Sequence, residues 1–478
     1  MLGVALGVFM GTLDASIVNI ALPTLVRALS TSFATVQWVV LGYLVAVTAL
    51  LLGAARLGDM VGKRPVYLAG LLVFTAGSLG CGLAPDVDWL IAARVLQGVG
   101  ASMTTSVGVA ILTEVFPPRE RGRALGIIGA VVSLGIALGP TLGGVLVGRV
   151  GWRSIFLVNV PVGLGAALLV ARVLPAPRPG RTQRFDFVGA LLVMLSLGCY
   201  ALGMTLAPRA GFTAPRPLGL LLVALLALVA FLAVERRVAQ PMLDLGVFEN
   251  PTLGLNLLMG MLVFFVLAGQ ALLMPFFLSL VRGYPTETVG LLLVTVPVCM
   301  AVSSPLAGAL SDRFGSRGIS VVGLSLIAVG CLLVSGMTEA GGPLDFVLRV
   351  VPTGLGVGLF QAPNNSAIMG AVPRGRLGVG SGLLSLSRTL GQSSGFPLMG
   401  ALFAAQVFAA EGSGERRDVT EAPKAALVAG LHGAFHVAVG VVLLAVALAL
   451  VAWRLDRGRP AAAVRPPPPA PRPGSAER

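Results

Sequence analysis

The stretch that decides the fold reads GDMVGKR at residues 58–64, and it recurs as SDRFGSR at residues 311–317. The two copies are 253 residues apart. Two other patterns repeat at nearly the same distance, because Arg94 is followed by Arg349 after 255 residues and a set of glycines recurs after 256. Three separate patterns that repeat at nearly the same offset indicate that the chain contains an internal duplication.

Long apolar runs surround both copies. Apolar residues make up 56% of the 478 residues and charged residues only 11%, whereas soluble domains carry about 25% charged residues. Many runs approach the roughly 20 residues that a helix needs to cross a bilayer. The composition excludes a water-soluble enzyme and predicts an all-α integral membrane protein with fourteen spans. We expect them at residues 3–26, 35–55, 66–84, 89–112, 124–147, 155–173, 187–206, 217–235, 253–281, 287–310, 318–337, 343–366, 378–408 and 431–454.

The duplication divides these spans into two related six-helix bundles. The predicted bundles are residues 1–173 and 253–455, joined by a linker with an inserted helix pair at residues 174–252. Residues 456–478 are rich in Pro and Arg and are expected to form a disordered cytoplasmic tail. Two six-helix halves with a site between them are typical of secondary transporters.

The basic residues predict the orientation. The formal net charge is +14, and 22 of the 34 Lys and Arg residues fall in segments on the side of the termini, against nine on the other side. Because Lys and Arg collect on cytoplasmic loops, both termini are expected to be cytoplasmic in a plasma-membrane protein. Aromatic residues make up only 6% of the chain and form no stacking platform, which argues against nucleic-acid binding.

The repeated motifs resemble those of the major facilitator superfamily, and specifically its fourteen-span drug:proton antiporters. Residues 55–64 follow the family loop pattern G-x-L-x-D-R-x-G-R-R except at the first Gly and first Arg, and the copy at residues 308–317 keeps both. Residues 94–100 (RVLQGVG) resemble the fourth-span motif. Residues 135–144 (GIALGPTLGG) match the fifth-span motif that this family associates with antiporters. The resemblance implies the major facilitator fold.

Asp14 is the candidate proton-coupling residue. It lies about 16 Å into the first span at 1.5 Å per residue, near the bilayer centre, where an acid is costly and is a functional candidate. The alternative is a structural acid held by a neighbour. Arg94, with Gln97 three residues later on the same helix face, is expected to tune the proton site or else to be satisfied by backbone carbonyls and Gln97. No acid occupies the equivalent second-half position near Leu267, so we expect one proton per cycle.

Two groups of residues are predicted to serve a conformational switch. Charged loop residues are expected to form latches between helix ends, and small residues of the fifth span are expected to form a pliable seam between the halves. Tight packing without gating is the alternative for the seam. The latch residues are Asp59, Arg64, Asp312, Arg313 and Arg317, and the seam residues are Gly135, Gly139, Pro140, Gly143 and Gly144.

The substrate cavity is expected to be mostly apolar with a few polar groups. The sequence leaves open the roles of Glu114, Arg349, Arg388, His432 and His436, and the spacing of its four cysteines fits no metal site. No cofactor is expected. The candidate cavity residues are Gln37, Trp38, Tyr43, Asn256, Gln270, Gln361, Asn364 and Asn365.

The resemblance implies a proton-coupled antiporter that exports amphipathic, cationic drugs or dyes by alternating access and so gives antibiotic resistance. The alternative is a dedicated exporter of one native metabolite, lipid or self-made antibiotic. A non-transporting receptor or enzyme is disfavoured, because two histidines and one intramembrane acid supply no catalytic cluster. The expected partners are protons, small amphipathic substrates and membrane lipids, and a monomer suffices.

Overall fold

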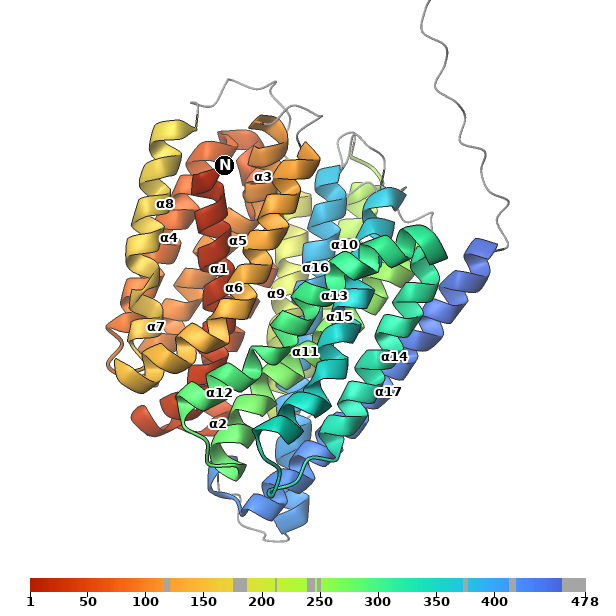
Figure 1. Ribbon diagram of the computed structural model, residues 1–478. Coiled ribbons are helices and arrows are strands. Elements are labelled where there is room, and N and C mark those ends of the chain that lie inside the picture. Colours follow the sequence, from red (N-terminus) through yellow and green to blue (C-terminus); the bar gives the residue numbers. More distant parts are fainter. Residues whose placement is uncertain are drawn as a thin grey trace, which may run out of the picture.

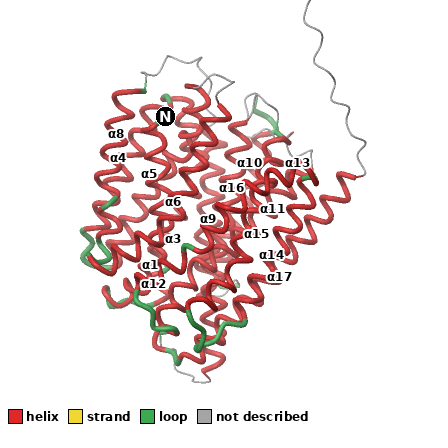
Figure 2. The backbone as a smooth tube through the Cα atoms, in the orientation of Figure 1, coloured by secondary structure: helices red, strands yellow, loops and turns green. Residues whose placement is uncertain are grey.

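The computed structural model is built from packed helices (Figures 1 and 2). It describes residues 1–115, 121–174, 187–210, 213–238, 246, 251–372, 377–411 and 418–457, and these ranges contain no strand. Thirteen helices in them are long and apolar enough to cross a membrane. The fourteenth expected span is α6 (Arg121–Arg149), whose apolar part in the described ranges is the shorter stretch Leu134–Arg149. The predicted all-α, multi-pass membrane architecture is confirmed.

The helices follow the predicted spans with small shifts at their ends. Spans 35–55, 155–173 and 287–310 are each divided into two helices, and the last helix begins at Lys424, seven residues before the predicted start. The predicted tail falls almost entirely outside the described residues. The elements are α1 (Leu2–Ala28), α2 (Phe33–Val36), α3 (Trp38–Val61), α4 (Lys63–Gly82), α5 (Val87–Val115), α6, α7 (Ser154–Leu157), α8 (Asn159–Val173), α9 (Phe187–Ala210), α10 (Pro215–Glu235), α11 (Pro251–Phe276), η2 (Phe277–Val281), α12 (Thr286–Leu293), α13 (Thr295–Phe314), α14 (Ser316–Ser335), α15 (Pro343–Ala371), α16 (Leu377–Glu411), η4 (Val419–Glu421) and α17 (Lys424–Arg457).

The two ends of the bundle are distinct. The start of α1 and the end of α17 lie at one end, here called the terminal end, and α2 and α12 lie at the other, the distal end (Figure 1). The inserted helices α9 and α10 pack on each other, and α9 contacts both α3 and α16. Its Tyr200 hydroxyl lies 2.6 Å from Ser394 Oγ on α16. The inserted pair is therefore attached to a helix from each side of the duplication.

The duplicated loop folds in the same way twice. Helix α3 passes into α4 through Gly62 alone, and α13 passes into α14 through Gly315 alone. The two glycines have φ angles of 104° and 84°, which residues with a Cβ rarely adopt. This is why the loop pattern keeps glycine at its eighth position in both copies.

The helix pairs that flank these loops also repeat. A Cβ at Gly100 would lie 2.7 Å from the Gly70 carbonyl oxygen where α5 crosses α4. A Cβ at Gly356 would lie 2.5 Å from the Gly323 carbonyl oxygen where α15 crosses α14. In each half the backbones touch directly, so the duplication extends from the sequence to helix packing.

Candidate functional site

Asp14 lies at the centre of a buried polar network. Its Oδ2 accepts a hydrogen bond of 2.6 Å from Arg94 Nη1, and the two side chains form an ion pair. Its Oδ1 accepts hydrogen bonds of 2.8 Å from Gln97 Nε2 and from Asn159 Nδ2. Asp14, Arg94, Gln97 and Asn159 are all at most 1% exposed. The sequence identified Asp14 and Arg94 as candidate site residues, and the structure places them in direct contact.

The remaining partners of Arg94 fix the guanidinium in place. Its Nε donates to the Val39 carbonyl oxygen at 2.9 Å, and Nη1 also donates to Gln97 Oε1 at 2.5 Å. The guanidinium carbon lies 4.4 Å from the centroid of the Tyr43 ring. Tyr43, which we expected in a substrate cavity, therefore belongs to the Asp14 network, where its ring face stabilises the cation.

The network was only partly visible in the sequence. Asn159, at the start of α8, and Ser78 of α4, whose hydroxyl accepts from Gln97 Nε2 at 2.7 Å, were not among the candidates. The sequence feature that could have identified Asn159 and Ser78 is that each is a polar residue within a long apolar run. All members come from α1, α3, α4, α5 and α8, so the network lies within the first six-helix half, and its one acid and one base make it neutral overall.

The seam glycines divide between two tasks. A Cβ at Gly135 or Gly139 would collide with Thr12 or Ser16 of α1, on either side of Asp14. The Ser16 hydroxyl also donates to the Gly135 carbonyl oxygen at 3.3 Å. Gly143 likewise packs on α1, so these three glycines hold α6 to the helix that carries Asp14 rather than to the second half.

Two glycines form the contact between the halves at the distal end. A Cβ at Gly144 of α6 would lie 2.8 Å from the Thr286 carbonyl oxygen and 3.2 Å from Gly290 Cα, both on α12. Its duplicate, Gly400 of α16, faces Gln37, and a Cβ there would lie 2.7 Å from Gln37 Oε1. Since Gln37 and Gly290 are also 253 residues apart, the two contacts are equivalent under the duplication. We call this pair of contacts the distal seam.

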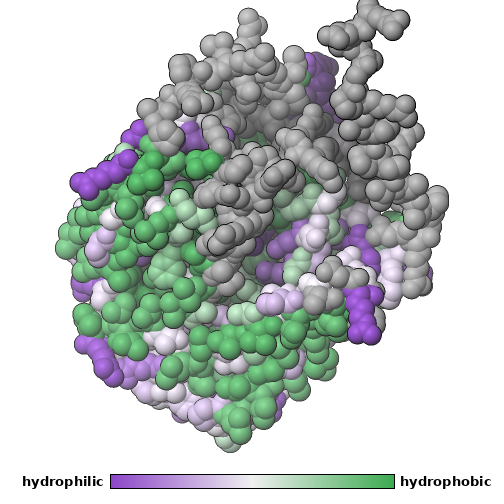
Figure 3. Space-filling model, turned by 45° about the horizontal axis from the view of Figure 1, so that its top comes forward, coloured by the Kyte–Doolittle hydropathy of each residue, from purple (hydrophilic) through white to green (hydrophobic). Residues whose placement is uncertain are grey.

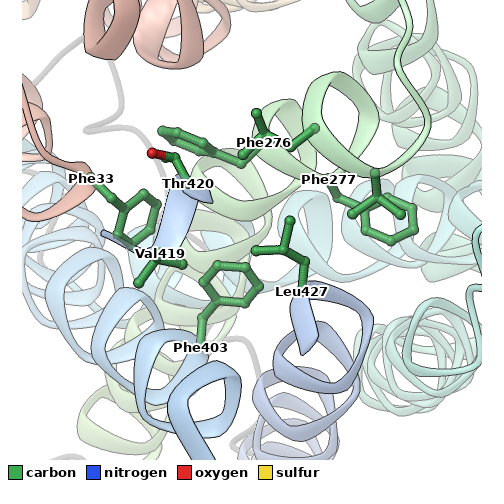
Figure 4. A pocket seen from close by; sticks show the side chains of 9 residues that line it. Phe33, Phe276, Phe277, Phe403, Val419, Thr420 and Leu427 are labelled. Carbon is green, nitrogen blue, oxygen red and sulfur yellow. The ribbon is translucent and has the colours of Figure 1, made fainter. Parts of the chain in front are cut away.

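Aromatic side chains close the distal end next to this seam (Figure 4). The Phe33 ring of α2 lies 4.8 Å from that of Phe276 and 5.8 Å from that of Phe403, between centroids. The Phe33 amide donates to Asp418 Oδ2 at 2.8 Å. These residues come from both halves and from the segment before α17, so the described residues join the halves at the distal end. Figure 3 turns the terminal end forward, and hydrophilic side chains are visible there among apolar ones.

The latch residues are only partly described. Arg64 Nη2 donates to the Ala171 carbonyl oxygen at 2.6 Å, near the end of α8, and Arg317 Nη1 donates to Asn256 Oδ1 at 2.9 Å. Arg313 is exposed. The side chains of Asp59 and Asp312, the acids of the predicted latches, fall outside the described part of the chain, as does that of Glu114.

Comparisons with known proteins agree with this architecture. The family model described as Major Facilitator Superfamily matches residues 4–395 and 257–478. The multidrug resistance protein Stp of Mycobacterium tuberculosis (strain CDC 1551 / Oshkosh) is 36% identical over 406 residues, 85% of this chain and 75% of that protein.

The chain belongs to the Major Facilitator Superfamily. Other relatives of this superfamily transporter are the riboflavin transporter RibZ of Clostridioides difficile (strain 630), 34% identical over 84% of this chain and 87% of that protein, and the tetracenomycin C resistance and export protein of Streptomyces glaucescens, 34% identical over 85% and 76%. A bacterial homologue of the human lysosomal transporter Spinster, in an inward-facing and unoccupied conformation, has the same fold, with a TM-score of 0.70 and 19% identity over 95% of this chain and 96% of that one. The protein is thus a membrane transporter and not an enzyme.

Three of the predicted cavity residues of this major facilitator transporter have contacts elsewhere in the molecule. Gln37 belongs to the distal seam, Tyr43 contacts Arg94, and Asn256 is buried against Arg317. Their polarity suggested a cavity, but it serves other contacts. Trp38, Gln361 and Asn365 are half-buried. Gln270 and Asn364 are buried, and each keeps a side-chain oxygen without a hydrogen-bond partner.

The remaining undecided residues lie away from the Asp14 network. Arg349 Nε donates to Asp345 Oδ1 at 2.6 Å, and Arg282 donates to the other oxygen of that carboxylate at 3.0 Å. His432 Nε2 lies 2.7 Å from the Met337 carbonyl oxygen, and His436 is exposed. Arg349, although it is the duplicate of Arg94, therefore has a different partner in the second half.

Proposed function

We propose that this transporter exports amphipathic small molecules in exchange for protons, with Asp14 as the proton site. The moving units would be the six-helix groups of residues 1–173 and 253–455. The observation that carries the proposal is the fully buried Asp14–Arg94 ion pair in the middle of the first half. The names of the relatives, which include multidrug resistance and tetracenomycin C export, support export as the direction.

The contacts of α1 provide a route from the proton site to the distal seam. A proton on Asp14 removes the charge that compensates Arg94, and a buried cation without its partner is costly. Arg94 and α1 must then rearrange relative to each other. Because α6 packs on α1 through Gly135, Gly139 and Gly143, and meets α12 through Gly144, such a movement is transmitted to the distal seam.

The proposal requires a second conformation. The Asp14 side chain is 0% exposed here, whereas proton exchange needs water at the carboxylate. We therefore propose that Asp14 takes up a proton when the distal seam is open and water reaches the network. The proton leaves in a further conformation, in which the seam is closed and water reaches the network from the terminal end. The excess of Lys and Arg in the segments on the side of the termini supports a cytoplasmic terminal end and a plasma-membrane location.

The geometry changes what we expect of the substrate. A cationic drug was expected because Asp14 could attract it, but three donors of the first half already satisfy that carboxylate. Asp14 in this state offers no free charge to a substrate. The proposed class is therefore amphipathic compounds without a requirement for positive charge.

Transport in inside-out proteoliposomes tests this function. Rhodamine 123, riboflavin and fluorescein supply a cationic, a neutral and an anionic aromatic compound. We expect at least one of them to accumulate when the lumen is acidic, and the accumulation to vanish when a protonophore is added. Accumulation that ignores the protonophore, or that needs ATP or sodium instead, would contradict proton exchange.

A further inference from the structure

The second half contains a half-buried cation within a membrane span that the mechanism above does not use. Arg388 lies on α16 inside the apolar span Gly382–Glu411. Its Nε atom is inaccessible and has no hydrogen-bond partner. This contrasts with Arg94, whose guanidinium is held by a carboxylate, an amide and a carbonyl oxygen.

Neighbouring contacts place Arg388 where the two halves meet. The preceding residue, Ser387, donates to the Leu257 carbonyl oxygen of α11 at 2.5 Å. Five residues further on, Ser393 Oγ lies 3.0 Å from Thr48 Oγ1 on α3 of the first half. The Arg388 guanidinium carbon lies 4.9 Å from the centroid of the Phe264 ring on α11. Arg388 thus lies on a helix that contacts both halves, and its own side chain packs on α11 of the second half.

A second polar group without a partner lies near the same stretch of α11. A Cβ at Gly260 of α11 would lie 3.2 Å from Ser387 Oγ and 3.5 Å from Asn364 Nδ2. Asn364 therefore approaches α11 at the turn next to Arg388, and its buried Oδ1 has no hydrogen-bond partner. One cationic donor and one amide acceptor are left unsatisfied on adjacent helices, and buried groups of this kind normally bind something.

Charge decides what Arg388 can bind. The ion pairs found among the described residues join Asp14 to Arg94, Glu287 to Arg149, and Asp345 to Arg282 and Arg349. None includes Arg388. An uncompensated cation within a membrane span is costly and marks a substrate pathway, and an anionic group on the cargo supplies the missing charge. Arginine is also well suited to carboxylates and to aromatic faces.

We propose that Arg388 is the charge-selecting residue of the substrate site and that the cargo is an aromatic compound bearing one or more negative charges. Its anionic group pairs with Arg388, its ring packs near Phe264, and a hydroxyl or amine on it donates to Asn364 Oδ1. The role of Arg388 in export rests on the proposed transport function. Its selectivity for anionic cargo does not, because selectivity is a property of binding. It reverses the cationic preference that the sequence suggested.

Equilibrium binding to the purified full-length protein tests the proposal. The probes are fluorescein, which is anionic, and rhodamine 123, a cation with a similar ring system, each followed by fluorescence anisotropy. We expect wild type to bind fluorescein more tightly than rhodamine 123. Arg388→Gln should weaken fluorescein binding by at least about tenfold, as expected for losing one buried charge-assisted hydrogen bond, and should leave rhodamine 123 binding unchanged or stronger.

The controls separate site chemistry from overall charge and folding. Arg216→Gln removes an exposed cation of the inserted helix α10, and it should leave both affinities unchanged. Arg388→Lys should recover part of the fluorescein affinity because it restores the charge. Tighter binding of rhodamine 123 by wild type, absence of fluorescein binding, or unaltered fluorescein affinity in a folded Arg388→Gln protein would overturn the assignment. Fluorescein selectivity without any response of transport to pH would instead contradict only proton exchange.

Discussion

Gly62 and Gly315 show how one residue type defines the duplicated loop. Each glycine is the single residue between two membrane helices, and each has a positive φ with ψ near 140°. Residues other than glycine reach this region only at a cost of about 1–3 kcal/mol. The tight connection between α3 and α4, and between α13 and α14, therefore depends on these two positions.

Replacing either loop glycine should destabilise the fold. Gly62→Ala and Gly315→Ala are each expected to lower stability by about 1–3 kcal/mol, observed as a lower thermal unfolding temperature in detergent. Gly53→Ala and Gly308→Ala are matched controls in α3 and α13, because a Cβ at either position meets nothing within 4 Å. Equal unfolding temperatures for loop and control variants would show that the backbone conformation is not limiting.

At the scale of elements, α6 connects the helix that carries Asp14, the proposed proton site, to the distal seam. Its glycines at 135, 139 and 143 pack on α1, and the next glycine, Gly144, packs on α12 of the other half. Small residues let the three backbones approach closely. A side chain at Gly144 would strike the backbone of Thr286 and Glu287, neither of which can yield by rotating a side chain.

A bulky residue at Gly144 should open the distal seam. The native side chains of Arg149 and Glu287 form an exposed ion pair across the seam at 3.4 Å. Nitroxide labels on Arg149→Cys and Glu287→Cys, in a background without other cysteines, therefore report the distance across the seam by double electron–electron resonance. Gly144→Val is expected to shift the distance distribution to longer values. Gly165→Val, where a Cβ meets nothing within 4 Å, should leave it unchanged. An unchanged distribution in Gly144→Val would mean that the seam does not limit closure.

Periodic and repeated features were the predictable part of the structure. The apolar runs predicted the spans, and the 253-residue repeat predicted the equivalence of Gly62 with Gly315. The ion pair between Asp14 and Arg94 could be anticipated because each is costly to bury alone. The contacts of the candidate cavity residues could not be anticipated. A polar residue in an apolar run can line a cavity, but it can also lie in a seam between the halves, as Gln37 does, or join two helices, as Asn256 does. Only the packing of helices distinguishes these roles.

At the scale of the whole molecule, the account depends on exchange between two conformations. The described residues join the halves at the distal end, and the only acid found well within the predicted spans is paired inside one half. One proton per cycle across a 100 mV potential supplies about 2.3 kcal/mol. The expected concentrating power is therefore modest, with any pH gradient adding to it.

The most direct test of this account is the luminal pH of proteoliposomes during transport of whichever dye the wild-type protein accumulates. Asp14→Asn alone leaves Arg94 buried without its counter-charge, which costs about 3–5 kcal/mol, so the informative variant is the neutral pair Asp14→Asn with Arg94→Gln. We predict that a dye gradient drives about one proton per dye in wild type, and that the double variant moves dye down its gradient with no change in luminal pH. Proton movement coupled to dye in the double variant would contradict the assignment of Asp14 as the proton site.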